Sequence, residues 1–176
     1  TKQFSKQARS MAAHDPKDIL NHLAGHKGFD YSQITDEIFI GTNMCCQYGF
    51  SKELLSKGVR ADISLEENHT DAPYGVDYFL WLPTEDNTPP SEKALNIGVK
   101  FLDFLISNKI KTFIHCKNGH GRATTLFAAY LVAQGKSVPE AIDFIKSKRP
   151  SIHLQDSQIK ALEEFKITGL KLAQNK

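Results

Sequence analysis

The stretch IKTFIHCKNGHGRATT, residues 110–125, decides the fold prediction for this chain of 176 residues. A short apolar run at 112–114 leads to His115 and Cys116. Five residues that include two glycines follow, and then come Arg122 and an apolar segment of helical character, 123–133. A short apolar run, a glycine-containing turn and a longer periodic segment are typical of a strand, a tight loop and a helix in that order.

The chemistry of this loop favours an anion, and phosphate in particular. Gly119 and Gly121 allow successive backbone N–H groups to face inward, where the start of the following helix adds positive potential. The same groups stabilise a thiolate at Cys116, which makes this cysteine a candidate nucleophile. Arg122 can offer two parallel N–H donors to two phosphoryl oxygens, a fork that lysine lacks. The alternative is a structural cysteine buried at a strand end.

Cys-x5-Arg, preceded by a strand and His115 and followed by a helix, resembles the signature loop of the cysteine-dependent protein tyrosine phosphatase superfamily. The resemblance covers residues 34–166 and indicates the dual-specificity branch, through Ala129-Tyr130-Leu131, Glu140-Ala141-Ile142, Lys148-Arg149-Pro150, Gln158, Leu162 and Phe165. The chain is short for the tyrosine-specific branch and has no counterpart of its Asn-Arg-Tyr motif. The resemblance implies an α/β fold with a central, mostly parallel, twisted sheet flanked by helices and a shallow cleft at the loop.

The rest of the chain fits that architecture. Strands are predicted at 37–40, 59–65 and 76–82, and helices at 51–57, at 91–108, from 138 and from 155. Asp15-Pro16 signals an earlier short packing helix. We therefore expect an N-terminal tail with that helix over residues 1–28, and one catalytic domain over 29–176.

The resemblance also implies the roles of individual residues. Cys116 would be the nucleophile, Arg122 the phosphate clamp and transition-state stabiliser, and Asp86 the general acid and later the base for water. Asp86 lies in a proline-rich strand-to-helix loop, 83–90; its rivals are Glu85 as the acid, or a turn-capping role for Asp86. His115 would orient the loop from below, and the backbone cradle would come from Lys117, Asn118, Gly119, His120 and Gly121.

One position departs from the family pattern. Most relatives place Ser or Thr after the arginine, where the hydroxyl helps the thiolate to leave, but this chain has Ala123, and Thr124 comes one residue too late. We expect slower turnover, with dephosphorylation of the enzyme as the affected step. Some plant glucan phosphatases resemble this chain in having Arg-Ala here.

The substrate class is the open question. Phosphotyrosine and phosphoserine or phosphothreonine in proteins are the first expectation. Lys117 and His120, projecting at the pocket mouth, keep phospholipid substrates as an alternative, and glucan is a further one. Two other classes stay in view: a pseudophosphatase that docks phosphorylated partners, and a sulfur enzyme similar to arsenate reductase or rhodanese, which would have no use for Asp86.

Composition limits the remaining possibilities. A formal net charge of +2 gives no argument for nucleic acid or a membrane surface. Three cysteines with two adjacent, Cys45 and Cys46, do not form a disulfide framework, so a reducing cytoplasmic setting is expected, with a targeting segment before Thr1 as an open alternative. Cys45 or Cys46 could form a reversible disulfide with Cys116, or both could be ordinary packing residues. A monomer is expected, without integral membrane segment.

No metal or organic cofactor is expected for the phosphate chemistry, because the loop amides and Arg122 already neutralise the phosphate. His22 and His26 lie four residues apart, but Gly25 interrupts the helix between them and no third ligand is near in sequence.

Overall fold

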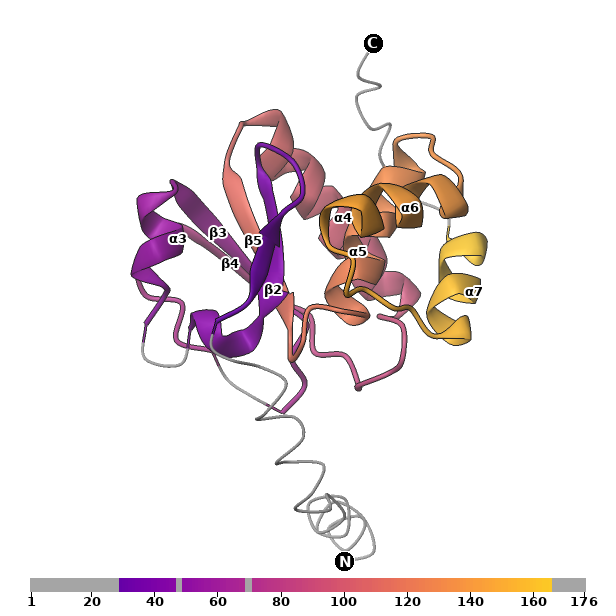
Figure 1. Ribbon diagram of the computed structural model, residues 1–176, viewed down its shortest axis with the longest axis horizontal. Helices are drawn as coiled ribbons and strands as arrows, with labels where there is room; N and C mark the ends of the chain where they lie inside the picture. Colours follow the sequence, from indigo (N-terminus) through magenta and orange to yellow (C-terminus); the bar gives the residue numbers. More distant parts are fainter. Residues whose placement is uncertain (1–28, 47–48, 69–70, 166–176) are drawn as a thin grey trace, which may run out of the picture. The chain divides into compact units, whose positions relative to one another are not determined.

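The computed structural model describes residues 29–46, 49–68 and 71–165. The predicted helix near Asp15 and the pair His22 and His26 lie outside these ranges, so the boundary at residue 28 stays a prediction. The described elements, in chain order, are β1 (Tyr31–Gln33), β2 (Ile38–Thr42), η1 (Asn43–Cys45), α3 (Lys52–Ser56), β3 (Val59–Ser64), β4 (Tyr78–Trp81), α4 (Glu92–Ser107), β5 (Lys111–Cys116), α5 (Arg122–Ala133), α6 (Val138–Lys148) and α7 (Asp156–Glu164) (Figure 1).

The five strands form one sheet in the order β1-β2-β5-β3-β4. Only β1 runs antiparallel to its neighbour, which confirms the mostly parallel sheet. Strand β5 is central: Cys116 pairs with Thr42 of β2, and His115 pairs with Ser64 of β3. The carboxyl ends of β2, β3 and β5 therefore meet at one edge of the sheet, where parallel α/β proteins place their binding sites.

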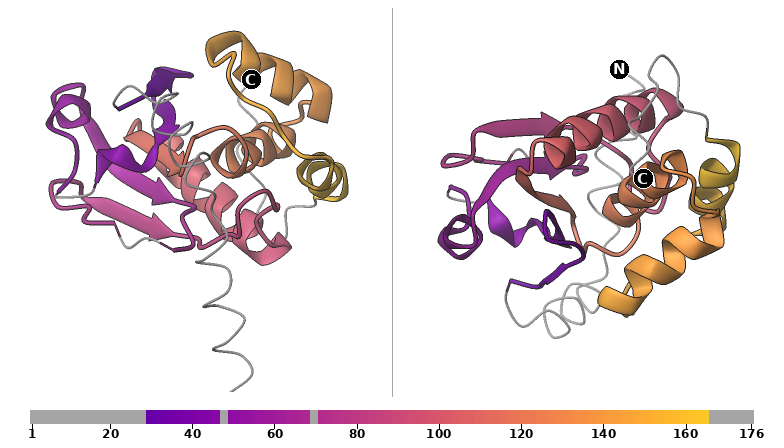
Figure 2. Two further views of the ribbon diagram at one scale, coloured as in Figure 1. Left: turned by 60° about the horizontal axis from the view of Figure 1, so that its bottom comes forward. Right: turned by 90° about the horizontal axis from the view of Figure 1, so that it is seen from above.

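Helices α4 and α5 pack on the sheet, and α6 and α7 pack against α5 (Figure 1, Figure 2). Strand β5 is buried from Thr112 onward, as expected for a parallel strand whose faces are covered. Helix α5 is buried along nearly its whole length because it lies between the sheet and the outer helices. The start of α5 is thereby held firmly against the end of β5.

Helix starts follow the local sequence signals. The Ser91 hydroxyl accepts a hydrogen bond from the Ala94 N–H at 3.2 Å, and Ser137 and Glu140 form a reciprocal capping box at the start of α6. Two details were predicted wrongly. Strand β4 is shorter than the predicted 76–82, and β1 was not predicted, since three half-exposed residues carry too little periodicity.

Candidate active site

Cys116 is the last residue of β5, and Arg122 is the first residue of α5. The loop between them turns sharply at Gly119, whose φ is +66°. A Cβ atom at this position would lie 2.5 Å from the carbonyl oxygen of Gly41 in the neighbouring strand. Only glycine satisfies both the left-handed backbone and the close approach. The predicted order of strand, tight loop and helix is confirmed.

Arg149, the residue after α6, braces the loop from its outer side. Its side chain is almost fully buried, and its Nε and Nη2 atoms donate to the carbonyl oxygens of Gly119 at 3.1 Å and Asn118 at 3.2 Å. A third donor, Nη1, reaches the hydroxyl of Ser32 at 3.3 Å. Carbonyls turned outward toward a cation leave the adjacent N–H groups free to face inward, which is what an anion cradle requires. The sequence marked Arg149 only as part of a family motif.

We expect Arg149→Lys to lower kcat/KM by about 10- to 100-fold, because a lysine cannot hold two carbonyls with a rigid fork, and a hydrogen bond to a charged donor contributes about 1.5–3 kcal/mol. Steady-state kinetics on an aryl phosphate would measure the loss. The matched control is Lys148→Gln, an exposed neighbour, which should change little. Equal kinetics for the two variants would contradict the bracing role.

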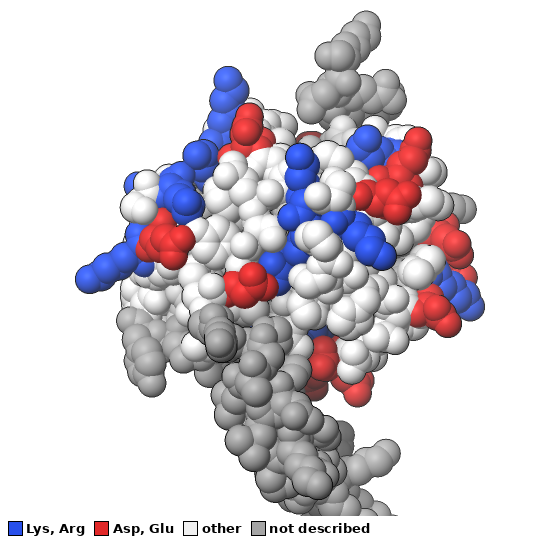
Figure 3. Space-filling model, in the orientation of Figure 1, with Lys and Arg blue, Asp and Glu red and all other residues white. Residues whose placement is uncertain are grey.

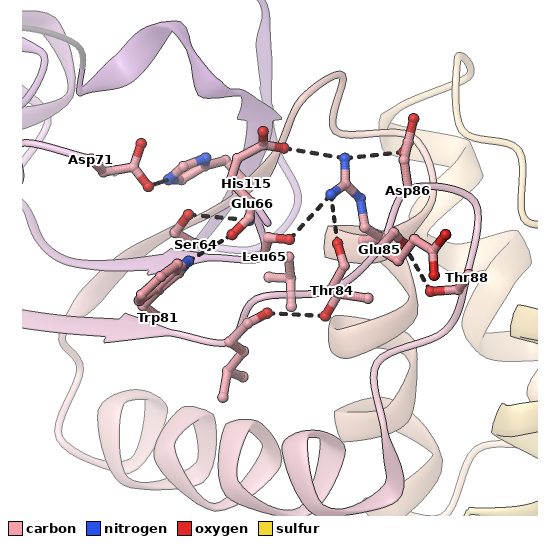
Figure 4. Close-up of polar contacts among 12 residues, drawn as sticks. Ser64, Leu65, Glu66, Asp71, Trp81, Thr84, Glu85, Asp86, Thr88 and His115 are labelled. Carbon is pink, nitrogen blue, oxygen red and sulfur yellow. Dashed lines mark hydrogen bonds and ion pairs between the residues drawn. The ribbon is translucent and has the colours of Figure 1, made fainter. Parts of the chain in front are cut away.

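The Arg122 guanidinium lies among four oxygen atoms. Nη1 donates to the carbonyls of Thr84 at 2.8 Å and Leu65 at 3.3 Å. Nη2 contacts Glu66 Oε1 at 3.1 Å and Asp86 Oδ1 at 3.0 Å, so that the two carboxylates reach the guanidinium from two sides (Figure 4). The Nε atom is buried and has no hydrogen-bond partner in the part of the chain that the structure describes. The Nη1 end of the arginine is thus fixed to the backbone and Nη2 is paired with the buried Glu66, while the exposed Asp86 is the partner that a ligand can displace.

Glu66 is a site residue that the sequence analysis did not single out. Its carboxylate is almost fully buried beside Arg122, while its backbone is held by Trp81, whose Nε1 donates to the Glu66 carbonyl at 2.6 Å, and by Ser64, whose hydroxyl accepts from the Glu66 N–H at 3.3 Å (Figure 4). A buried carboxylate paired with a buried arginine fixes the position of both groups. In the sequence Glu66 is one of two adjacent acids after β3, and nothing there distinguishes it.

A cavity opens beside Cys116 and Arg122. Its lining comes from the acid loop, the signature loop and the segment leading into α7: Asp86, Asn87, Cys116, Asn118, His120, Gly121, Arg122, His153, Gln155 and Gln158. The Asp86 side chain is 59% exposed, so it can move within this cavity. Glu85 is not among the lining residues in the described chain, and its carbonyl accepts from the Thr88 hydroxyl at 2.8 Å.

The predicted cradle residues divide into two groups. Asn118, His120, Gly121 and Arg122 line the cavity, whereas Lys117 and Gly119 of the described loop are not among its lining residues. The ring of His120 lies 5.1 Å, centroid to centroid, from the ring of His153, which lines the same cavity. Ala123 is fully buried in the first turn of α5. The roles of all these residues stay predictions, and the predicted positive charge from Lys117 at the pocket mouth gains no support from its placement.

His115 lies in a buried polar environment behind the loop. Its Nε2 atom is 3.3 Å from Asp62 Oδ1, 3.6 Å from Asp71 Oδ2 and 3.6 Å from Cys46 Sγ. Burial by itself would lower the pKa of His115, but the carboxylate of Asp62 outweighs it, so the pKa is raised well above the ordinary value. Burial also raises the pKa of the Cys45 thiol, which contacts Cys46. All three cysteines are free thiols.

The fold and this geometry agree with sequence comparison. Residues 38–168 match the sequence model of the family described as dual specificity phosphatase, catalytic domain. The chain belongs to this family. As a dual specificity phosphatase domain it contains Cys116, Arg122 and Asp86 within the matched residues, which also include Glu66 and Arg149.

Curated relatives of this dual specificity phosphatase domain carry several activities in their names. It is 33% identical over 93 residues to phosphatidylglycerophosphate phosphatase PTPMT1 of Arabidopsis thaliana, covering 52% of this chain and 28% of that protein. It is 28% identical over 130 residues to tyrosine-protein phosphatase yvh1 of Schizosaccharomyces pombe, covering 70% of this chain and 37% of that protein. Laforin of Mus musculus is 24% identical over 176 residues, covering 84% and 53%. The matches thus span about half or less of these relatives' lengths.

Solved structures give the same fold. The crystal structure of PTPMT1 superposes with a TM-score of 0.64 at 28% identity, covering 77% of this chain and 93% of that one. The crystal structure of DUSP15 superposes with a TM-score of 0.68 at 21% identity, covering 76% and 85%. Among the described residues of this dual specificity phosphatase domain, no helix has the length and apolar character needed to span a bilayer.

Proposed function

We propose that the chain is a phosphomonoester hydrolase that acts through a phosphocysteine intermediate on Cys116. The observation that carries the proposal is the meeting of three groups at one cavity: the Cys116 thiol, the Nε of Arg122, which has no partner among the described residues, and the exposed carboxylate of Asp86. A pure phosphate-binding module would need the arginine and the loop amides but neither a nucleophile nor an acid.

Arg122 can bind a phosphoryl group through its Nε and Nη2 atoms but not through Nη1. Its Nη1 atom is held by the Thr84 and Leu65 carbonyls, so the guanidinium cannot rotate freely. A phosphoryl group can then take Nε and Nη2 as a parallel pair of donors, displacing Asp86 from Nη2 while Glu66 keeps its contact. The displaced Asp86 side chain stays in the cavity, where the leaving group must lie.

The two half-reactions follow from this arrangement. The Cys116 thiolate attacks phosphorus, the bond to the ester oxygen breaks, and Asp86 in its acid form protonates that oxygen as it leaves. Asp86 then accepts a proton from water, the water oxygen attacks phosphorus, and the P–S bond breaks to regenerate the thiolate. Arg122 and the loop amides stabilise the charge on the equatorial oxygens in both steps.

For the substrate, phosphorylated side chains of proteins are the first proposal, and phospholipid monoesters are the second. The second is favoured by the likeness to relatives named for phosphatidylglycerophosphate and by a structural neighbour crystallised as PTPMT1 in complex with PI(5)P, which is 26% identical. On the side of the chain in Figure 3, basic and acidic side chains are interspersed. A panel of phosphopeptides and of phosphatidylglycerophosphate in detergent micelles, compared by kcat/KM, distinguishes the two classes.

The acid role is tested by Asp86→Asn with Glu85→Gln as the matched control. We expect Asp86→Asn to lower kcat by about 10²-fold or more, since a general acid contributes about 10² to 10⁴. The loss should be larger for phenyl phosphate than for nitrophenyl phosphate, because a better leaving group needs less protonation. Glu85→Gln should keep nearly full activity. A loss independent of the leaving group, or a larger effect at Glu85, would reject this assignment.

A further inference from the structure

A second cluster of reactive side chains lies outside the phosphate cavity. It consists of Cys45 at the end of η1, Cys46 beside it, Asp62 in β3 and His115 in β5, and we call these four residues the thiol cluster. All four side chains are buried, and one candidate ligand atom from each lies within 4.8 Å of all the others. Cysteine thiolates, imidazole and carboxylate together form a donor set typical of zinc.

Polar atoms in the thiol cluster lack partners. Both carboxylate oxygens of Asp62 are buried and have no hydrogen-bond partner within residues 29–46, 49–68 and 71–165. The contact of Asp62 with His115 is an ion pair at 3.3 Å without hydrogen-bond geometry. Asp71 brings a second carboxylate to the same imidazole at 3.6 Å. Buried polar atoms without a partner are costly, and a bound cation would give the Asp62 carboxylate a partner that the described residues do not provide.

Two of the distances among the ligand atoms fit a tetrahedral ion. Zinc lies about 2.3 Å from sulfur and about 2.0–2.1 Å from nitrogen and oxygen, so a tetrahedron has edges of about 3.6 Å from sulfur to nitrogen and about 3.4 Å from nitrogen to oxygen. The corresponding distances here are 3.6 Å from Cys46 Sγ to His115 Nε2 and 3.3 Å from His115 Nε2 to Asp62 Oδ1.

The two sulfur atoms are the part that must move. They lie 2.6 Å apart as free thiols, and a tetrahedral ion would separate them to about 3.8 Å. Cys45 ends the short 3₁₀ helix η1 and Cys46 follows it, so both sulfur atoms belong to a segment outside the strands of the sheet.

We propose that Cys45, Cys46, Asp62 and His115 bind one divalent ion of the zinc type in a closed, four-ligand structural site. Asp71 lies beside the site but is not one of the four ligands: its Oδ1 accepts from the Cys46 thiol at 3.3 Å, and this hydrogen bond is lost when Cys46 binds as a thiolate. None of the four residues lines the phosphate cavity in the described structure, so the ion takes no part in phosphoryl transfer. It would join η1 and β3 to β5 immediately before the nucleophile, and the inference stands independently of the proposed phosphatase activity.

The experiment measures metal content and not turnover. The full chain is purified in the presence of reductant and zinc, desalted and analysed for bound metal, and a parallel sample receives cobalt for absorption spectroscopy. We expect about one equivalent of zinc per chain and a thiolate-to-cobalt charge-transfer band. Cys46→Ser should lose both.

The matched control is Cys116→Ser, which removes the other buried thiol and should bind metal as the wild type does. A second experiment uses the wild-type chain alone, so that it does not depend on how variants fold. Alkylation of each cysteine is measured by mass spectrometry with and without zinc. Zinc should protect Cys45 and Cys46 and leave Cys116 reactive. The proposal is overturned if the reduced chain takes up no metal, if Cys46→Ser binds as well as wild type, or if zinc protects Cys116 in place of the adjacent pair.

Discussion

Replacing Cys116 by serine is expected to lower phosphatase turnover by on the order of 10⁶-fold, the scale of loss when a nucleophile is removed. Serine keeps the shape of the site, and the loop amides and Arg122 stay in place. Its hydroxyl, however, is not ionised at neutral pH and is a far weaker nucleophile than a thiolate. Phosphate or tungstate binding should persist, because the cradle does not depend on the sulfur.

Turnover and anion binding are measured separately. Turnover is followed with an aryl phosphate in the absence of added metal, and anion binding is followed by the rise in melting temperature with tungstate. Turnover of Cys116→Ser within about tenfold of wild type would reject the phosphocysteine mechanism. A wild type that binds tungstate but hydrolyses nothing would instead make the docking-module alternative the leading one.

Replacing Gly119 by alanine is expected to remove both turnover and anion binding. The added methyl group would lie 2.5 Å from the Gly41 carbonyl oxygen and 3.0 Å from the Gly41 Cα, atoms of the backbone of β2 that cannot rotate away. The positive φ of Gly119 adds strain of about 1–3 kcal/mol. The loop must therefore shift, and its N–H groups lose their common direction.

Gly135→Ala provides the control for backbone strain alone. Gly135 also has a positive φ, of +100°, but nothing lies within 4 Å of its added Cβ atom. We expect both variants to lower the melting temperature, and only Gly119→Ala to lose tungstate binding. Loss of anion binding in Gly135→Ala to the same extent would show that general destabilisation, and not the clash with β2, accounts for the effect.

The sequence predicted the parts of the site that are local in the chain. Residues 112–133 contain the strand, the turn and the helix start within one stretch, so Cys116 and Arg122 could be placed by pattern alone. Asp86 was predicted from its loop and from family likeness, and the structure brings it to the cavity beside Arg122.

The groups that hold Arg122 and the loop in position were beyond sequence reasoning, because they come together only through the sheet. Glu66 reaches Arg122 since β3 and β5 are neighbours that end at the same edge, and Arg149 reaches the loop since the end of α6 passes close to it. Asp62, in contrast, could have been recognised from the sequence. A charged residue inside an otherwise buried parallel strand is rare without a partner or an ion, and it could have been noted as an anomaly.

The Asp86 carboxylate competes with the phosphoryl group of any substrate for the Nη2 atom of Arg122. Asp86 is a tethered anion whose effective concentration at Nη2 is set by the loop and does not fall when the solution is diluted. The apparent affinity for any phosphate ester is the intrinsic affinity reduced by the fraction of molecules in which Asp86 has moved aside. Inorganic phosphate meets the same competitor after hydrolysis. The return of Asp86 to Arg122 would therefore help to expel the product and reset the site for the next substrate.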